Sequence, residues 1–560
     1  MCSRVLCVAV ECLTLLAACS GGQAQPTAVA PQPLKVAPDL RVRRAQFIQQ
    51  SLDADTSSLT AGDLKALDHL VRAAKIVDEI FLRQAWEGNP AFAPRVAALT
   101  GPDSQAAKDY YRIMAGPWDR LKEFEPFLGR AVHPAGAGFY PEDMTKEEFE
   151  KHVAANPGDK AAFTSVTTVI RRQGAKLVAV PYSKEYRELL KKAASELRDA
   201  AAATGNATLK KFLRARADAF LSDDYYASDL AWMDLNSPIE VVIGPYETYE
   251  DGLFGYKAAF EAFVCVAQAK DSEQLAKYKQ ELPFLESRLP IPDQYKNTKR
   301  GTDSPIQVAD EVITAGDARR GVQTLAFNLP NDERVREARG SKKVLLKNMM
   351  RAKYDGILAA IATRTLPKDE TVSVDFASYF HHTLFHELAH GLGPGRIKVD
   401  GRDTEVRLEL KELFPAIEEA KADVLGVYTL AVLTNKKVVP VGVVEPLPYT
   451  YVAGLFRAAR FGTTEAHGLG TVIQASYLLD KGAIEVTPDG RFRPVLEKFA
   501  GGIRDLAHDL LMIEAQGSYA GAQEIVKKHG TVPPAMAKLL GSLTDIPVDV
   551  DPFFAADSRK

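Results

Sequence analysis

A strand-rich segment in the middle of the chain separates two long stretches of helical pattern. From about residue 46 to 235, apolar residues recur at spacings of three and four, which predicts amphipathic helices. The segment IEVVIGPYETYEDGLFGYKAAFEAFVCV (239–266) is instead rich in β-branched and aromatic residues, which predicts two strands around a turn. VQTLAFNLPND (322–332) is a further strand candidate that ends at Pro330. Helical pattern returns from about residue 343, so we expect a mostly helical α+β protein.

The length of the chain limits its organisation, and its charge limits its partners. A chain of 560 residues is too long for one hydrophobic core, so two large lobes are the expected arrangement. Its 46% apolar and 26% charged residues are typical of a globular protein. Lys and Arg number 70 against 73 Asp and Glu, so the chain has no basic excess with which to bind nucleic acid.

The first residues, MCSRVLCVAVECLTLLAACSGG, have the composition of a secretory signal. One basic residue precedes a short apolar run from Val5 to Ala18, and small residues follow. The run is too short to be a permanent membrane-spanning helix. The stretch LAAC at residues 16–19 resembles a bacterial lipobox, in which the cysteine is acylated, and Ser20 is not the aspartate of an inner-membrane retention signal.

This pattern predicts an exported lipoprotein. We expect residues 1–18 to be a signal peptide, Cys19 to carry lipid, and residues 19–45, rich in Pro, Ala and Gln, to be a flexible tether. The protein would lie on the periplasmic side of the outer membrane or at the cell surface, and the lipid would be its sole membrane contact. A buried N-terminal helix is the alternative reading.

Cysteine usage agrees with export. Four of the five cysteines lie in the first 19 residues, so Cys265 alone would remain free in the mature chain. An intramolecular disulfide and a cysteine-based zinc site are then both excluded. Cys265 lies in the apolar stretch FEAFVCVA, where an inert buried thiol is expected.

The segment FHHTLFHELAHGLGPG (380–395) holds four of the ten histidines. His386 and His390 are four positions apart, so on a helix their rings project from one face, one turn apart. With Glu387 they form HExxH, in which two histidines bind a metal ion and the glutamate is the general base. We expect the helix to begin near Asp375 and to end at Gly391 or Gly393.

Two histidines leave a catalytic zinc site one protein ligand short. The stretch IEEAKADVLGVYTLAVL begins 27 residues after His390, reads as a second helix, and carries acidic residues at its start: Glu418, Glu419 and Asp423. One of these carboxylates could bind the ion while another accepts the free N–H of a ligand histidine. A solvated acidic helix start is the alternative.

His382 lies on the same stripe as His386 and could be a third ligand. A ligand series over two turns spans about 12 Å, too wide for bonds near 2 Å to one ion. We therefore expect His382 to support the site or to pack in the interior, and His381 to be structural.

The pairing of HELAH with EEAKAD, preceded by NLPND and by IGPYETYEDGLFGYKAAFEAFV, resembles the dipeptidyl peptidase III family of zinc peptidases. The similarity covers roughly residues 236–490. Typical members have a six-residue HExxGH motif, whereas this chain has the five-residue form, as in a shorter-motif bacterial branch. Release of single residues therefore stays open beside release of dipeptides.

The resemblance implies a role for each matching residue at the metal. It makes three residues the ligands of one zinc ion: His386, His390 and Glu419. It makes Glu387 the general base that acts on zinc-bound water. It makes two further carboxylates hold the ligand histidines in orientation: Glu418 and Asp423.

The resemblance also implies how a peptide is held. Tyr249 matches a tyrosine that hydrogen-bonds the scissile carbonyl, and His467 matches a histidine that stabilises the transition state. Glu247, Asn328 and Asn331 match residues that grip the free amino terminus of the peptide. Ordinary turn and capping roles are the alternative for all five.

The family architecture implies two lobes around a cleft. A lobe that mixes helices with a β-barrel-like sheet would comprise residues 46–267 and 312–350. A helical, zinc-bearing lobe would comprise residues 268–311 and 351–540, and residues 541–560 would be a C-terminal tail. A cleft lined by a sheet edge favours short peptides, bound by strand addition.

Other functions are compatible with the same motif. Another zinc amidase or an aminopeptidase would use the same metal ligands, and a non-catalytic lipoprotein could capture peptides or zinc. Intact Glu387 argues against the last, since a binding protein gains nothing from a base beside the metal. The ligand types alone leave cobalt and manganese as alternatives to zinc.

Overall fold

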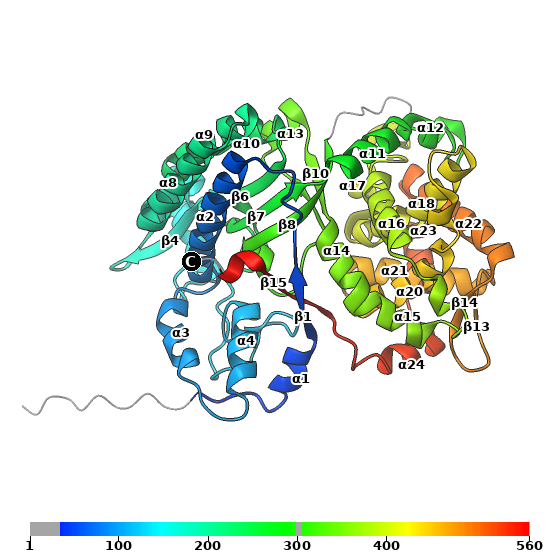
Figure 1. The fold of residues 1–560 in the computed structure, drawn as a ribbon, viewed down its shortest axis with the longest axis horizontal. Coiled ribbons are helices and arrows are strands. Elements are labelled where there is room, and N and C mark those ends of the chain that lie inside the picture. Colours follow the sequence, from blue (N-terminus) through cyan, green and yellow to red (C-terminus); the bar gives the residue numbers. More distant parts are fainter. Residues whose placement is uncertain (1–33, 298–304, 559–560) are drawn as a thin grey trace, which may run out of the picture.

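The computed structural model describes residues 34–297 and 305–558, so the predicted signal peptide and Cys19 lie outside the described residues. The described chain forms two lobes side by side, a sheet lobe and a helical lobe (Figure 1). The mostly helical α+β class is confirmed. Within the described ranges, no helix is long and apolar enough to cross a membrane.

A five-stranded sheet is the centre of the sheet lobe. Its strands, in spatial order, are β6 (Ile239–Glu247), β7 (Ala259–Ala267), β8 (Ile306–Gly316), β10 (Lys342–Leu346) and β9 (Ala326–Leu329). All neighbours are antiparallel except β8 and β10. The barrel-like closure that the resemblance implies stays a prediction, because the pairings run from β6 at one edge to β9 at the other.

The predicted strands are central because almost every residue of β6 and β7 is buried, which suits their Val, Ile and Phe content. Cys265 on β7 is fully buried, as expected of an inert thiol. Burial, with nearby carboxylates, raises the pKa of that thiol well above its usual value.

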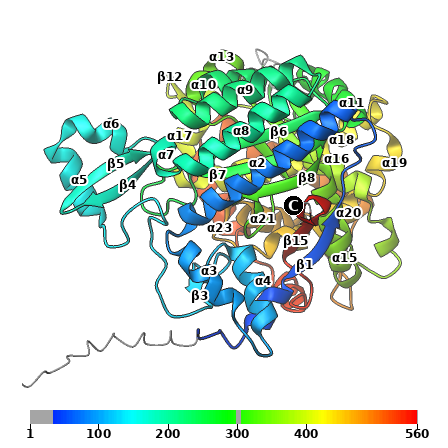
Figure 2. The same ribbon diagram turned by 60° about the vertical axis from the view of Figure 1, so that its left-hand side comes forward.

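Long helices cover one face of this sheet. α2 (Ala61–Ala85) packs on β7 and β8 and is in turn covered by α8 (Arg187–Ala203) (Figures 1 and 2). α2 begins with a capping box in which Thr60 and Asp63 bond each other's backbone N–H. Four further helices belong to this lobe: α7 (Tyr182–Glu185), α9 (Ala207–Ser222), α10 (Tyr226–Met233) and α13 (Glu333–Arg339).

Two smaller regions extend from the sheet lobe. A second apolar core is formed around five elements: α1 (Leu40–Ala45), α3 (Asn89–Ala97), α4 (Ser104–Met114), β2 (Trp118–Asp119) and β3 (Glu125–Pro126). An arm that protrudes from the side of the lobe (Figure 2) consists of four: α5 (Lys146–Ala155), α6 (Lys160–Phe163), β4 (Thr168–Gln173) and β5 (Lys176–Pro181).

The helical lobe is built on two adjacent helices, α16 (Phe376–Ala389) and α18 (Phe414–Asn435). α20 (Leu447–Ala459) packs on α16, while α21 (Ala466–Asp480) and α22 (Leu496–Ala515) pack on α18. The remaining elements are α11 (Ala269–Gln280), α12 (Leu282–Ser287), α17 (Val406–Leu410), α19 (Val441–Val444), α23 (Tyr519–His529), α24 (Pro534–Gly541) and the hairpins β11 (Arg396–Val399) with β12 (Arg402–Glu405) and β13 (Ile484–Val486) with β14 (Phe492–Pro494).

The chain first passes between the lobes from β7 to α11, and further links between the lobes lie later in the sequence. α14 (Lys347–Lys353) follows β10 and continues through a π-helical turn into α15 (Ala359–Thr365) (Figure 1). At the end of the chain, β15 (Asp549–Phe554) returns to pair in parallel with β1 (Phe47–Leu52).

The structure differs from the predicted division at two points. The boundary at residue 311 falls inside β8, yet the whole strand belongs to the sheet because its two halves pair with β7 and β10. Residues 541–560, predicted as a tail, include β15, whose buried Asp549 pairs with Lys353 Nζ at 2.8 Å.

Candidate metal centre

The HExxH segment forms the end of α16. Asp375 caps this helix, because its carboxylate accepts the backbone N–H of Ser378 at 3.0 Å. The helix ends at Ala389, and His390 is its C-terminal cap. The expected start at Asp375 agrees with the structure, and the helix ends two residues before Gly391 and four before Gly393, the two expected ends.

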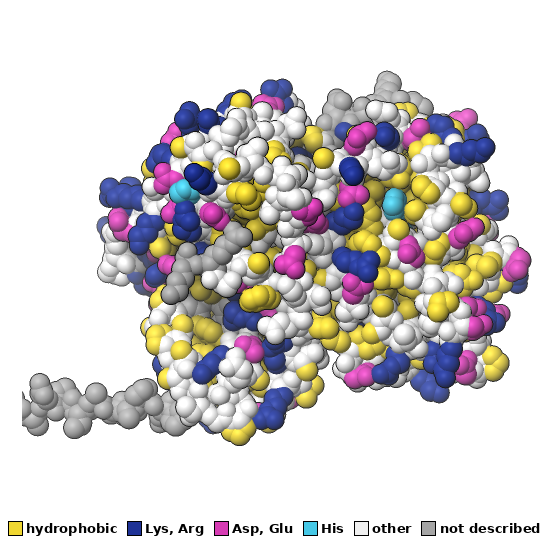
Figure 3. All heavy atoms as spheres, viewed as in Figure 1, with side chains coloured by type: hydrophobic (Ala, Val, Ile, Leu, Met, Phe, Trp, Pro, Cys, Tyr) yellow, Lys and Arg dark blue, Asp and Glu magenta, His cyan; other side chains and the backbone are white. Residues whose placement is uncertain are grey.

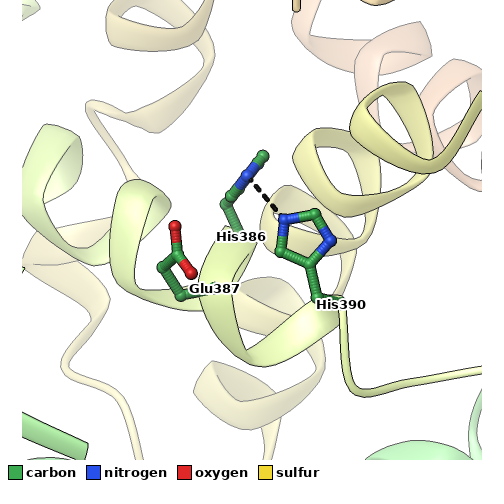
Figure 4. Close-up of side chains that lie close together, drawn as sticks. All are labelled: His386, Glu387 and His390. Atoms are coloured by element: carbon green, nitrogen blue, oxygen red, sulfur yellow. Dashed lines mark hydrogen bonds between the residues drawn. The ribbon is translucent and has the colours of Figure 1, made fainter. Parts of the chain in front are cut away.

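The two histidine rings converge on one point. His386 Nε2 and His390 Nε2 lie 3.1 Å apart, on the same side of the helix (Figure 4). Each ring uses its other nitrogen to reach a carboxylate: His386 Nδ1 contacts Asp423 and His390 Nδ1 contacts Glu418, both at 2.8 Å. Because each Nδ1–H donates to a carboxylate, both Nε2 lone pairs are available to a metal ion.

Glu419 supplies a third donor atom. Its Oε2 lies 3.3 Å from His386 Nε2 and 3.9 Å from His390 Nε2. Donors bound to one tetrahedral ion at about 2.1 Å are about 3.4 Å from each other, so the three atoms fit a common zinc ion. Glu419 Oε2 is also buried without a hydrogen-bond partner, which is costly unless a cation occupies the space.

Small residues allow this convergence. A Cβ at Gly426 of α18 would lie 3.2 Å from the backbone nitrogen of His386, and one at Gly470 of α21 would lie 3.0 Å from the carbonyl oxygen of Ala416. Glycine at both positions lets α18 approach α16 and α21 approach α18. The close approach brings Glu419 to the histidines.

The carboxylates that hold the histidines are themselves anchored. Asp423 accepts the side-chain amide of Gln474 at 3.0 Å, and Glu418 accepts Lys421 Nζ at 2.8 Å. Burial opposes ionisation of Glu418, but Lys421 and His390 overcome it and lower its pKa to about 2. Both carboxylates are therefore anionic acceptors at neutral pH.

Glu387 lies beside the two ligand rings (Figure 4), and one of its carboxylate oxygens is within 4.8 Å of a nitrogen of each ring. It is mostly buried, and its carboxylate accepts Lys343 Nζ from β10 at 3.0 Å. Burial alone would raise its pKa, but Lys343 and the two ligand histidines lower it. Glu387 is thus an ionised acceptor, which is the state a general base requires.

His467 reaches the same centre from the start of α21. Its Nε2 lies 3.2 Å from Glu419 Oε2, and its Nδ1 contacts Glu465 at 2.7 Å. His382, in contrast, directs Nε2 to the backbone oxygen of Asp423 at 3.0 Å and packs on Tyr451. His382 therefore supports the site and is turned away from the ion position. This agrees with the expectation that histidines spread over two helical turns cannot all bind one ion.

A cavity of about 550 Å³ opens beside the centre. It is lined by His386, Glu387 and His467 from the helical lobe and by residues 322–326, which lead into β9, from the sheet lobe. On the face drawn in Figure 3, hydrophobic side chains gather along the hollow between the lobes. A substrate in this cavity would contact both lobes.

The residues expected to hold a peptide are only partly together. Asn331 Nδ2 donates to Glu247 Oε1 at 3.2 Å, and Asn328 lies exposed on edge strand β9. Tyr249 is 85% exposed, and no contact joins it to the metal centre in the described residues. Glu247 and Asn331 therefore form one cluster, from which the metal centre is separate in this conformation.

Sequence reasoning did not find Lys343 or Gln474. Lys343 is 44 residues before Glu387, and Gln474 is 51 residues after Asp423. Neither lies in a motif of the sequence. The structure places Lys343 opposite Asn328 across β10 and β9, a register that no local pattern of the sequence indicated.

Comparisons with known proteins agree on one family. The model of peptidase family M49 matches residues 141–421, which include HExxH, Glu418 and Glu419. A protein of Arabidopsis thaliana named Nudix hydrolase 3 is 37% identical over 570 residues, which cover 92% of this chain and 74% of that protein.

Solved structures are similar over nearly the whole fold. The structure of DPP III from Caldithrix abyssi has 49% identity and a TM-score of 0.90, and covers 92% of this chain and 99% of that chain. The structure of dipeptidyl-peptidase III from Corallococcus sp. strain EGB has 42% identity and a TM-score of 0.78, and the match covers 93% of this chain and 98% of that chain.

These similarities extend far beyond the HExxH motif. They confirm the family resemblance noted in the sequence and the two-lobe architecture that it implies. The candidate metal site falls inside the matched region. The chain is therefore a metallopeptidase of family M49, the dipeptidyl peptidase III family of zinc peptidases.

Proposed function

We propose that the chain is an exopeptidase that releases dipeptides from the free amino terminus of short peptides and uses one zinc ion held by His386, His390 and Glu419. One observation carries the proposal. Three donor atoms from two helices lie 3.1 to 3.9 Å apart, beside an ionised glutamate in a cavity between the lobes. Membership of family M49 supports it.

Zinc in such a site supplies a Lewis acid that acidifies water and polarises a peptide carbonyl. Glu387 takes the proton of the attacking water on its carboxylate and delivers it to the leaving amine. Lys343 holds that carboxylate in the cavity through its 3.0 Å contact. Asp423 and Glu418 hold the ligand rings in the tautomer that leaves Nε2 free.

His467 lines the cavity next to Glu419, and its ring can donate to a developing oxyanion. Burial would lower its pKa, but Glu419 and Glu465 raise it, which favours the protonated donor. Tyr249 is far more exposed, so it acts on the carbonyl only after the lobes close on a peptide, as the family resemblance implies.

The sheet lobe provides the binding surface for the peptide. β9 is the edge strand, and Leu325 and Ala326 at its start line the cavity. A peptide that adds to this edge gains backbone hydrogen bonds without regard to its side chains. Its amino group then meets the oxygens of Glu247, Asn328 and Asn331, which favours a free, positively charged terminus.

The test is product analysis by mass with a tetrapeptide, once with a free and once with an acetylated amino terminus. We expect the first two residues to be released as a dipeptide from the free peptide, and the acetylated peptide to be cleaved at least about tenfold more slowly, because a charged contact is lost. The purified, zinc-loaded full chain is the enzyme.

Each other product pattern favours a different function. Release of single residues would identify an aminopeptidase, and equal cleavage of the blocked peptide would identify an amidase without terminal recognition. Zinc uptake without cleavage across a peptide library would identify a binding lipoprotein. Each of these results contradicts dipeptide release.

We also propose that Cys19 anchors the protein to a membrane by lipid. The LAAC stretch at residues 16–19 supports this. In bacterial cells that produce the full chain, Cys19→Ser should move the protein from the membrane to the soluble fraction and abolish labelling by a fatty-acid analogue. Cys12→Ser, inside the predicted signal peptide, is the matched control. An unchanged distribution of the Cys19 variant would contradict lipidation.

A further inference from the structure

An unpaired guanidinium lies in the same cavity as Glu387 and His467. Arg457, on α20, lines this cavity, and its Nε is buried without a hydrogen-bond partner. Among the described residues, no hydrogen bond or ion pair reaches Arg457. The neighbouring cation Lys353 is paired, because its Nζ lies 2.8 Å from Asp549. A partly buried cation without a partner is costly, so its place in the cavity indicates an anionic ligand.

Two further polar groups beside Arg457 also lack partners. Tyr379 is 7% exposed, lines the cavity, and has a hydroxyl group without a hydrogen bond. Tyr379 on α16 and Arg457 on α20 line the same cavity, and the two helices pack on each other. The side-chain oxygen of Gln323 is likewise buried, unpaired and part of the lining.

These groups suit a carboxylate. A guanidinium and a phenol hydroxyl are hydrogen-bond donors, and Arg binds carboxylates in a two-pronged geometry. The amide of Gln323 presents its NH₂ in the same direction only after a rotation that breaks the 3.2 Å hydrogen bond from its Nε2 to the carbonyl oxygen of Gly321. The other acids that line the cavity already have partners, since Glu387 contacts Lys343 and Asp423 contacts His386.

The distance of Arg457 and Tyr379 from the metal centre decides which part of a bound peptide they contact. Tyr379 precedes His386 by seven residues on α16, so it lies two turns away on the same face, at a distance of about 10 Å. An extended chain advances about 3.3 Å per residue. A carboxylate bound there is therefore about three residues from the scissile bond.

The direction of β9 identifies the end of the peptide. β9 leads from Gln323 and Leu325, in the cavity, towards Asn331, which contacts Glu247. A peptide added antiparallel to β9 has its amino end near Asn331 and its carboxyl end near Gln323. The amino-terminal residues thus lie on one side of the metal centre, and Arg457 lies on the other.

We propose that Arg457 and Tyr379, with Gln323, form a subsite for a peptide carboxylate on the leaving-group side of the scissile bond. The carboxylate bound there is the carboxyl terminus of a peptide of about five residues. The inference rests on the proposed dipeptide release and adds a length limit to it. A free carboxyl terminus at that distance selects short peptides over long ones.

The experiment compares kcat/KM for two pentapeptides of one sequence, one with a free carboxyl terminus and one with a carboxyl-terminal amide, and for a third peptide amide whose last residue is replaced by glutamate. A dipeptidyl arylamide, which has no residue beyond the scissile bond, tests dipeptide release separately. The wild-type enzyme should prefer the free carboxylate to the neutral amide roughly tenfold to hundredfold, as expected of a charge-assisted contact. A preference for the glutamate amide would assign the subsite to a side-chain carboxylate instead.

Two variants test the residues. Arg457→Met should bring the ratio of kcat/KM for the carboxylate peptide to kcat/KM for the amide peptide close to one. Arg457→Lys should restore part of this ratio, because lysine returns the positive charge but not the two-pronged geometry of the guanidinium. Tyr379→Phe removes only an unbonded hydroxyl, so the fold is preserved, and the ratio should fall several-fold. Arg504→Met, at an exposed arginine of the helical lobe, is the matched control and should keep the wild-type ratio.

Failure of the inference and failure of the proposed function give different results. If the arylamide is cleaved but the wild-type enzyme treats carboxylate and amide alike, or Arg457→Met keeps the ratio, the subsite is wrong and dipeptide release stands. If the zinc-loaded enzyme does not cleave the arylamide or any peptide, dipeptide release itself is wrong.

Discussion

Glu387→Gln is expected to lower kcat/KM for dipeptide release by about 10²- to 10⁴-fold and to leave zinc binding within a few-fold of wild type. The glutamine amide keeps the shape and the hydrogen bonding of the side chain, but it cannot accept the proton of the attacking water. Lys343 then contacts a neutral amide in place of a carboxylate, while the histidine rings and Glu419 keep their positions. Peptide turnover and zinc content by atomic emission are measured on the same preparation.

The zinc measurement separates two roles for Glu387. Its carboxylate lies close enough to His386 and His390 to be counted as a possible third ligand. If Glu387→Gln loses zinc together with activity, Glu387 is a metal ligand. If the variant binds zinc and cleaves peptides at the wild-type rate, Glu387 is not the general base. Glu445→Gln, at an exposed glutamate of the helical lobe, is the matched control, and both zinc and turnover should be unchanged.

The parts of the site that the sequence could predict are those within one helix. The spacing of four between His386 and His390 fixes their relative position, because a helix has 3.6 residues per turn. Asp375 was recognisable as the cap for the same local reason. The adjacent Glu418 and Glu419 point about 100° apart on α18, so one reaches a ring nitrogen while the other reaches the ion position.

The rest of the site depends on how distant segments pack, and local pattern does not contain that information. Lys343 reaches Glu387 only because β10 of the sheet lobe ends close to α16, and Arg457 enters the cavity only because α20 packs on α16. From the sequence alone, each reads as an ordinary exposed cation. Structure was needed to show that Lys343 is paired and that Arg457, among the described residues, is not.

The same limit applies to the fold. β6 and β7 were predictable because an apolar, β-branched run of that length suits a buried strand. β15 was not, because its sequence DVDPFF is short, acidic and contains Pro552, and its partner β1 lies about 500 residues away. Local sequence pattern does not show which distant segment such a strand pairs with.

Glu419→Gln is expected to weaken zinc binding by more than about 100-fold and to abolish most turnover. Loss of a carboxylate that supports a ligand typically costs 10- to 100-fold in metal affinity, and loss of a ligand should cost more. The variant keeps the size of the side chain, so α18 still packs against α16. Zinc affinity is measured by competition with a chelator, and the circular dichroism spectrum checks the fold.

Two comparisons make this prediction specific to Glu419. Asp423→Asn should lower zinc affinity only 10- to 100-fold, because it frees the His386 ring without removing a donor atom. His467→Ala should retain zinc, because the three ligands His386, His390 and Glu419 remain in place. The alternative set of His386, Glu419 and His467 also brings three donor atoms close together. If His467→Ala loses zinc as fully as Glu419→Gln, while His390→Ala keeps it, that alternative set holds the metal, and the role of HExxH must be revised.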